Sequence, residues 1–445
     1  MMGGNVSKWT MSYFAIAIAW LFAAEALMVA GFGFPAVDIA APETLVLVHI
    51  VAIGWLSLCV CGALTQFVPV LVGKPLCSEA AALPALGLLT AGLTALLLGF
   101  LALGGWLPPW LWLLPLGATL LASGFGLLAA NLILTIWRAR PLSAPARFVL
   151  AGLASLGATA ALGASFAWGL AGYGGAPLNA LLEAGTSLHA IAGLGGWLTL
   201  TAMGVSYRLL AMFMLSPDVD QRRSRVTLYI GAGTIGLALA GGLVAVALQA
   251  GLDLVLAVTG VAGIATVALY GRDVVALYRN RKRRALELNT SMALYALASL
   301  AGSVLLGLTL ALGGTLVAKV GALIFLIAFG WLSGLVLAKL YKIVAFLTWL
   351  ETYGPVMGRV PTPRVQDLVV EPRAARWFVG YFVCVWLAAA LLLAGQTPAF
   401  RLATLGMMAG TIGVVRELLR VRRLADVTKS VRLPQGARQP RLLHS

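Results

Sequence analysis

Charged residues are scarce in this sequence. Only 10% of its 445 residues are Asp, Glu, Lys or Arg, and 61% are hydrophobic. A soluble globular protein carries roughly 25% charged residues, so this composition excludes a fold with water as its only solvent. A membrane-spanning helix needs about 20 apolar residues, and twelve such helices would use roughly 240. The composition therefore predicts an all-α polytopic membrane protein in contact with the lipid bilayer.

Acidic residues are the scarcer of the charged ones. There are 15 Asp and Glu against 31 Lys and Arg, which gives a formal net charge of +16. Such an excess is also typical of nucleic-acid-binding proteins. Here, however, the basic residues lie in loops and in a tail between hydrophobic blocks, where the positive-inside rule places them. We therefore expect no nucleic-acid partner.

Cysteine and histidine are also rare, with four and three residues. Cys59, Cys61 and Cys384 lie in hydrophobic blocks and Cys77 lies in a loop, a pattern that argues against a disulfide framework. The sequence has no phosphate-binding loop, no His-Glu-x-x-His and no serine-nucleophile elbow in a suitable context. These absences exclude several common enzyme classes and leave open whether the chain is an enzyme.

Twelve apolar blocks follow one another along the chain. The first is too long for a signal-peptide core and no cleavage site follows it, so we expect a retained span. The blocks predict one transmembrane domain over 1–415, a longest internal loop over 347–375 and a basic cytoplasmic tail over 416–445. The approximate ranges of the blocks are 11–33, 44–73, 80–104, 109–136, 147–172, 183–213, 226–249, 252–270, 290–312, 316–346, 376–394 and 397–415.

Basic residues alternate between the two sets of loops. One set, which includes both termini, holds nearly all of them, while the opposite set holds only Lys319 and Arg401. Arg208, Lys339 and Lys342 lie towards the inner ends of blocks six and ten. The positive-inside rule therefore predicts a multi-pass protein of a bacterial inner membrane, with both termini in the cytoplasm.

A tryptophan motif recurs every four blocks. Its copies are Gly54-Trp55-Leu56-Ser57, Gly196-Trp197-Leu198-Thr199 and Gly330-Trp331-Leu332-Ser333. In each copy a small residue falls seven positions after the Trp, and a polar residue falls eleven after it: Gln66, Arg208 and Lys342. These spacings are about two and three helical turns, so the residues share one stripe. The pattern predicts three four-helix pseudo-repeats about a pseudo-threefold axis, with chance similarity among Gly- and Leu-rich helices as the alternative.

Three ionisable side chains inside the blocks are candidates for chemistry. His49 and His189 precede the Trp of their motif copies by six and eight residues, and the third copy has no histidine. A neutral imidazole ligates haem iron or copper well, although a histidine bonded to a neighbouring carbonyl is the structural alternative. Glu25 lies alone in the middle of the first block, where a carboxylate is costly and usually functional. We interpret it as a proton-transfer group or part of a polar network.

Twelve spans, internal termini and three four-helix units resemble subunit I of the haem-copper oxidases. At motif level the resemblance rests on His49, the exit of block two from Pro69 to Pro75, His189 and the Tyr341-Lys342-Ile343-Val344 run. In that family a second-span histidine ligates the low-spin haem and a sixth-span histidine ligates copper, and His49 and His189 match these by span. Blocks seven and ten lack the family's other ligand histidines, so a complete oxygen- or nitric-oxide-reducing site is excluded.

The resemblance implies a reduced member of the superfamily, such as the haem- and copper-associated membrane proteins of the nitric-oxide response. Haem b, or copper, would be bound by His49 and His189, with His189 as the metal ligand. The role would be respiratory or nitric-oxide related, with a cytochrome or another respiratory subunit as partner. Two other functions stay open: a proton-coupled transporter that uses Glu25 and the polar stripe, and a cofactor-free assembly or structural subunit.

Overall fold

The computed structural model of the chain describes residues 9–441, and every regular element within that range is a helix. The prediction of an all-α polytopic membrane protein is confirmed. Twelve helical segments are long and apolar enough to cross a membrane: Thr10–Ala30, Pro42–Val72, Ala82–Leu103, Leu113–Trp137, Ala144–Leu170, Thr186–Met214, Gln221–Ala247, Asp253–Arg279, Leu288–Leu312, Leu316–Val356, Glu371–Leu393 and Thr397–Arg422.

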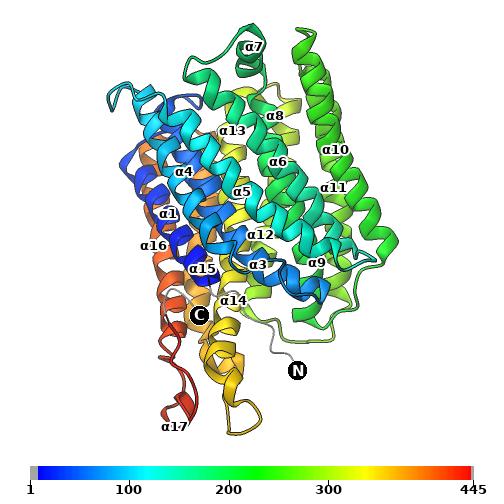
Figure 1. Cartoon of the computed structure of the whole chain (residues 1–445), viewed down its shortest axis with the longest axis vertical. Coiled ribbons are helices and arrows are strands. Elements are labelled where there is room, and N and C mark those ends of the chain that lie inside the picture. Colours follow the sequence, from blue (N-terminus) through cyan, green and yellow to red (C-terminus); the bar gives the residue numbers. More distant parts are fainter. Residues whose placement is uncertain (1–8, 442–445) are drawn as a thin grey trace. The chain divides into compact units, whose positions relative to one another are not determined.

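Two compact units make up the chain, Ala40–Ala285 and Met1–Ile39 with Leu286–Ser445. The single transmembrane domain over 1–415 stays a prediction. The helices of the first-named unit, which we call the histidine unit because it contains both His49 and His189, are α2 (Pro42–His49), α3 (Leu58–Val72), α4 (Ala82–Leu103), α5 (Leu113–Trp137), α6 (Ala144–Leu170), α7 (Ala176–Ala184), α8 (Thr186–Ala190), α9 (Thr201–Met214), α10 (Gln221–Ala247) and α11 (Asp253–Arg279) (Figure 1).

Helices α4 and α5 of the histidine unit are in direct backbone contact. A methyl group added at Gly117 of α5 would lie 2.5 Å from the backbone nitrogen of Leu96 in α4. Gly92 of α4 is equally crowded, because a methyl group there would lie 2.8 Å from the backbone nitrogen of Leu121. Small residues permit such close approach between membrane helices, whose association relies on packing.

The other unit, which we call the carboxy-terminal unit, contains the first span and the last four. Its α-helices are α1 (Thr10–Ala30), α12 (Leu288–Leu312), α13 (Leu316–Phe325), α14 (Gly334–Tyr353), α15 (Glu371–Leu393), α16 (Thr397–Arg422) and α17 (Lys429–Arg432). Short 3₁₀ turns, η4 (Gly354–Val356) and η5 (Val365–Leu368), connect α14 to α15. Prolines lie near the starts of α15 and α16. Backbone N–H groups in the first turn of a helix have no acceptor within the helix, so proline, which lacks this group, costs no hydrogen bond there.

Three π-helical segments occur at equivalent places in spans two, six and ten. They are η1 (Ile50–Ser57), η2 (Ile191–Leu200) and η3 (Leu326–Ser333), and each contains one copy of the Gly-Trp motif. Ser57 and Ser333 donate hydrogen bonds to the carbonyls five residues earlier, both at 2.7 Å. Because π-helix is rare and usually appears as single turns at functional sites, its recurrence supports a true repeat of the motif. The arrangement of three four-helix units stays a prediction.

Several predicted helix ends are wrong at the basic side of the spans. The block predicted over 252–270 continues as α11 to Arg279, and α16 continues to Arg422 inside the predicted tail. The predicted loop over 347–375 is shorter at both ends, because α14 ends at Tyr353 and α15 begins at Glu371. The apolar pattern stops before these helices do, because their last turns carry charged side chains. Glu351 of α14 and Arg422 of α16, for example, pair with each other at 2.8 Å.

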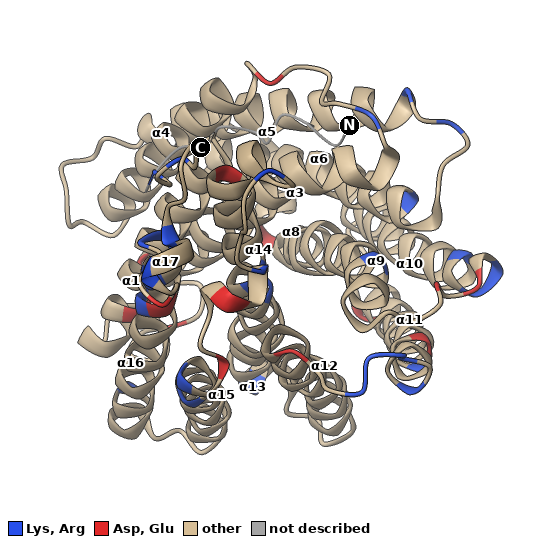
Figure 2. Cartoon of the chain, turned by 90° about the horizontal axis from the view of Figure 1, so that it is seen from below, with Lys and Arg blue, Asp and Glu red and all other residues tan. Residues whose placement is uncertain are grey.

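The basic tail packs against the end of α14. The hydroxyl of Tyr353 donates to the carbonyl of Arg432 at 2.7 Å, and the backbone N–H of Arg441 donates to Glu351 at 3.0 Å. Within each unit, Lys and Arg gather at the end of the helices seen in Figure 2, near the start of α10 and around α17. Positions 442–445 of the predicted tail lie outside the described residues.

Candidate functional site: a pair of histidines

The two intramembrane histidines lie side by side in the histidine unit. His49 is the last residue of α2, directly before η1, and His189 lies in α8, two residues before η2. Their ring centroids are 6.4 Å apart with an angle of 29° between the ring planes. The two imidazoles therefore meet because each stands at the same end of a π-helical segment in neighbouring spans.

The nitrogens of the two rings are in different states. His49 Nδ1 lies 2.7 Å from the carbonyl oxygen of Leu45, and because a carbonyl only accepts, Nδ1 carries the proton. The lone pair of His49 is then on Nε2. A histidine that ligates a metal usually donates its other N–H to such a carbonyl, which fixes its orientation. His189 Nδ1 is buried and has no hydrogen-bond partner among residues 9–441. A buried nitrogen without a partner is costly. The predicted ligand role of His189 stays a prediction.

The surroundings of the pair are apolar and close. Phe100 of α4 lies 5.0 Å from the His49 ring, and Phe166 of α6 lies 5.6 Å from the His189 ring, both measured between centroids. Gly163 of α6 faces His189, because a methyl group there would lie 3.0 Å from Cε1. The site is thus a narrow apolar recess with two nitrogen donors.

The distance between the ring centroids can be compared with that expected for two imidazoles that share one ion. Two imidazoles on opposite sides of an ion would have centroids roughly 6.3 Å apart, given about 2.0–2.1 Å from metal to nitrogen and about 1.1 Å from nitrogen to centroid. The observed value is 6.4 Å. Within residues 9–441 there is no group of three or more His, Cys, Asp or Glu side chains suited to a metal. If a copper ion or a haem iron were bound here, His49 and His189 would be the residues that hold it.

A hydrogen bond links spans two and six about two helical turns away from the pair. Trp197 Nε1 of η2 donates to Ser57 Oγ of η1 at 2.9 Å, and both side chains are buried. Ser57 and Trp197 each follow their histidine by eight residues. The repeated motif therefore supplies a hydrogen bond that fixes the register of the two segments that follow the histidines.

Glu25 is fully buried in α1 of the carboxy-terminal unit. The hydroxyl of Thr411 in α16 donates to Glu25 Oε1 at 2.7 Å, while Oε2 has no hydrogen-bond partner within the described residues. The predicted proton-transfer or polar-network role stays a prediction. Its single polar contact links the first span to the last.

The residues of the predicted polar stripe differ in exposure. The tryptophan of each copy is buried, and so is the small residue seven positions after it, which is Gly62, Gly204 or Ala338. Gln66 is half-buried, whereas Arg208 is exposed and pairs with exposed Asp218 at 3.3 Å. Exposure of Arg208 agrees with a long basic side chain that reaches the interface from the end of its span, and the functional role of the stripe stays a prediction.

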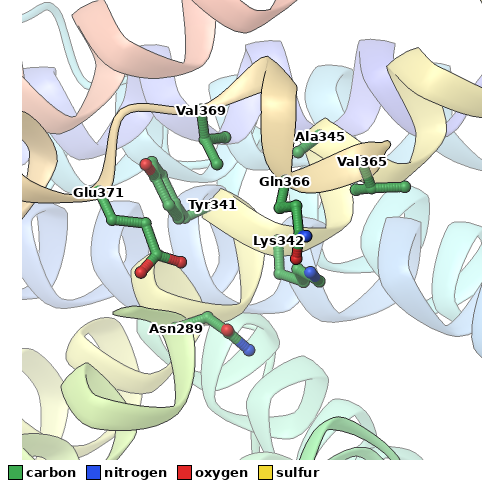
Figure 3. Close-up of a pocket in the computed structure, with 8 residues that line it drawn as sticks. All are labelled: Asn289, Tyr341, Lys342, Ala345, Val365, Gln366, Val369 and Glu371. Atoms are coloured by element: carbon green, nitrogen blue, oxygen red, sulfur yellow. The ribbon is translucent and has the colours of Figure 1, made fainter. Parts of the chain in front are cut away.

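Lys342, the stripe residue of the third copy, lies in the middle of α14 and lines a small pocket to which η5 and the starts of α12 and α15 also contribute. Its ammonium pairs with Glu287 at 2.8 Å. Figure 3 shows the Glu371 carboxylate between Tyr341 and Asn289, with the Gln366 amide beside Lys342. Tyr341 Oη and Asn289 Nδ2 are buried without partners among residues 9–441. Lys342, which the repeat spacing singled out, thus lies among polar side chains from other elements that the spacing did not predict.

Asp273 is a buried carboxylate that the sequence analysis missed. It accepts from Tyr207 at 3.0 Å and from Arg272 at 2.9 Å, and its side chain is 1% exposed. One sequence feature could have predicted that Asp273 lies within a helix. It is the hydrophobic run Val274-Val275-Ala276-Leu277, which extends the helical pattern of α11 beyond Tyr270.

No protein-family model and no curated protein matches the sequence. Among solved structures, the fold is similar to a chain from a cryo-EM structure of a haem-copper terminal oxidase dimer. The match covers 97% of this chain and 84% of that chain, at 12% sequence identity and a TM-score of 0.42. No role for any residue of this chain follows from so distant a likeness.

Proposed function

We propose that the chain is a membrane protein that holds a haem iron or a copper ion between His49 and His189. The observation that supports this most is the 6.4 Å separation of the two imidazoles, together with the unpartnered nitrogen of His189. A haem or copper bound there would supply one-electron redox chemistry. The protein's own contribution is to orient both rings through Leu45 and the Trp197–Ser57 bond, and to exclude water with Phe100 and Phe166.

The proposed role is respiratory or related to nitric oxide, without oxygen reduction. The whole chain has three histidines, and only two lie inside the spans. Two nitrogen donors suffice for one cofactor and do not suffice for a haem with an adjacent copper. A pyridine-haemochrome spectrum and a copper determination on protein expressed with both supplied test the proposal. Purified wild-type protein that carries neither would overturn it.

The proposed location is a bacterial inner membrane with both termini in the cytoplasm. We expect a cysteine introduced by Arg283→Cys to resist a membrane-impermeant maleimide in intact cells, and one introduced by Ala176→Cys to react. The reason is the concentration of Lys and Arg in the loop that contains Arg283. Reaction of both variants after membrane permeabilisation is the control. Labelling at position 283 in intact cells would reverse the orientation.

A second candidate function, a proton-coupled carrier, is favoured by the buried carboxylate of Glu25 with its one unpartnered oxygen. If it operates, Glu25→Gln is expected to abolish acid-driven proton entry into proteoliposomes, measured with an internal pH dye. Glu183→Gln changes an exposed acid of α7 and is the matched control. Equal proton entry in wild type and Glu25→Gln would exclude this function.

A further inference from the structure

A pocket lined by arginines lies where α15 begins and α16 ends. Its walls are Arg373, Arg376 and Trp377 of α15 with Arg416, Glu417 and Arg420 of α16. All six residues belong to the carboxy-terminal unit, and the pocket is independent of the histidine pair. Its position at the basic end of two adjacent spans places it at the boundary between membrane and cytoplasm, if the proposed orientation holds.

Two of the four arginines are neutralised by carboxylates. Arg373 forms a two-pronged bond to Glu417, with Nε–Oε1 at 2.8 Å and Nη2–Oε2 at 2.7 Å. It also reaches Asp426 at 2.6 Å, and Arg420 contacts the same carboxylate at 2.6 Å. The hydrogen bonds from Arg420, followed by those from Arg373, lower the pKa of Asp426 to about 2. These ion pairs give the back of the pocket a fixed shape and no net charge.

The other two arginines supply the charge of the pocket. Arg376 and Arg416 are exposed, and neither forms an ion pair with a carboxylate among residues 9–441. The Arg376 guanidinium lies 5.3 Å from the ring centroid of Trp377, a contact that orients the cation. The indole is itself fixed, because it lies directly against the backbone of α16 at Gly413.

An apolar face continues from each of these two arginines into the membrane region. On α15, Arg376 is followed at helical spacing by exposed Val379, Val383 and Leu387. On α16, exposed Ile412 and Leu405 precede Arg416 at the same spacing. A cationic pocket joined to two apolar stripes matches a molecule with an anionic head and apolar chains.

We propose that this pocket binds the phosphate of an anionic phospholipid, with Arg376 and Arg416 contacting its oxygens and the acyl chains lying along the stripes of α15 and α16. Guanidinium groups suit phosphate because their N–H groups bond its oxygens in pairs. Anionic lipids are attracted to basic residues at the cytoplasmic face. The apolar stripes favour a lipid over free phosphate.

The test compares lipid binding by purified protein, using native mass spectrometry with phosphatidylglycerol and phosphatidylcholine. For the double variant Arg376→Gln/Arg416→Gln, we expect phosphatidylglycerol to bind about tenfold more weakly, with phosphatidylcholine unchanged. Arg222→Gln/Arg223→Gln removes the same charge from exposed positions of α10 and should keep wild-type binding. Arg376→Lys/Arg416→Lys keeps the charge without the paired geometry and should give intermediate binding.

The outcomes separate the alternatives. Wild-type phosphatidylglycerol binding by the Gln double variant, or an equal loss in the α10 control, would overturn the proposal, because binding would then follow overall charge. If millimolar inorganic phosphate raises the melting temperature as much as phosphatidylglycerol does, the pocket binds free phosphate and the proposal of a lipid ligand is wrong. Equal melting temperatures of all variants in phosphatidylcholine would show that the fold is intact, as expected for exposed side chains.

Discussion

His49→Ala and His189→Ala are each expected to reduce the haem or copper content of the purified protein to background. Either substitution removes one of two donors whose rings lie 6.4 Å apart, and the remaining imidazole would hold the ion less firmly. The measurement is cofactor per protein, from the pyridine-haemochrome spectrum and elemental analysis of protein in its folded, monodisperse fraction. An unchanged cofactor content in His49→Ala would show that the cofactor is held elsewhere.

A glycine pair on α6 provides a sharper test of the same site without removing a ligand. Gly163→Ala puts a methyl group 3.0 Å from Cε1 of His189, so the ring must shift by a few tenths of an ångström. Gly157→Ala, on the same helix, meets nothing within 4 Å. We expect partial cofactor loss or a shifted absorption band in Gly163→Ala and wild-type behaviour in Gly157→Ala. Identical spectra would mean that the His189 ring is not a ligand.

The architecture was largely predictable because lipid imposes simple rules on a sequence. Twelve apolar blocks predicted twelve spans, since every backbone group inside a bilayer must bond within its own helix. The ends of the spans were less predictable. Helix α16 continues through the charged residues Glu417 and Arg422, because Arg373 and Glu351 from other elements neutralise them, and those partners are distant in the sequence.

At the candidate site, too, features set by neighbouring residues in the sequence were predictable, and contacts between distant segments were not. The recurrence of the Gly-Trp motif placed His49 and His189 in equivalent copies of the repeat, six and eight residues before the Trp, and this signal was local. The π-helical winding was not predictable, because nothing in residue spacing separates it from an α-helix over eight or ten residues. Nor was the Trp197–Ser57 bond, which joins positions 140 residues apart. Nor did the spacing predict that Arg208 pairs with Asp218 of the following loop.

The packing of α4 on α5 is expected to be the most sensitive part of the histidine unit. Gly117→Ala would place a methyl group 2.5 Å from the backbone nitrogen of Leu96 and 2.8 Å from the carbonyl oxygen of Gly92. Backbone atoms do not move aside as a flexible side chain does, so the two helices must separate. Overpacking of this kind costs about 1–3 kcal/mol. A melting temperature lowered by several degrees in detergent is the expected result.

Gly126→Ala is the matched control for this prediction. It lies on the same helix as Gly117, and a methyl group there meets nothing within 4 Å. Its melting temperature should equal or slightly exceed that of wild type, because alanine favours helix over glycine. Equal melting temperatures for Gly117→Ala and Gly126→Ala would contradict the close contact of α4 and α5.

The same substitution connects the fold to the candidate site. Helix α4 carries Phe100, whose ring packs 5.0 Å from that of His49, and α5 packs against α6, which carries Phe166 beside His189. Separation of α4 from α5 would therefore loosen the apolar wall on the His49 side. We expect Gly117→Ala to lower cofactor content as well as stability, whereas a purely structural role for the histidine pair would leave the absorption spectrum of the surviving folded protein unchanged.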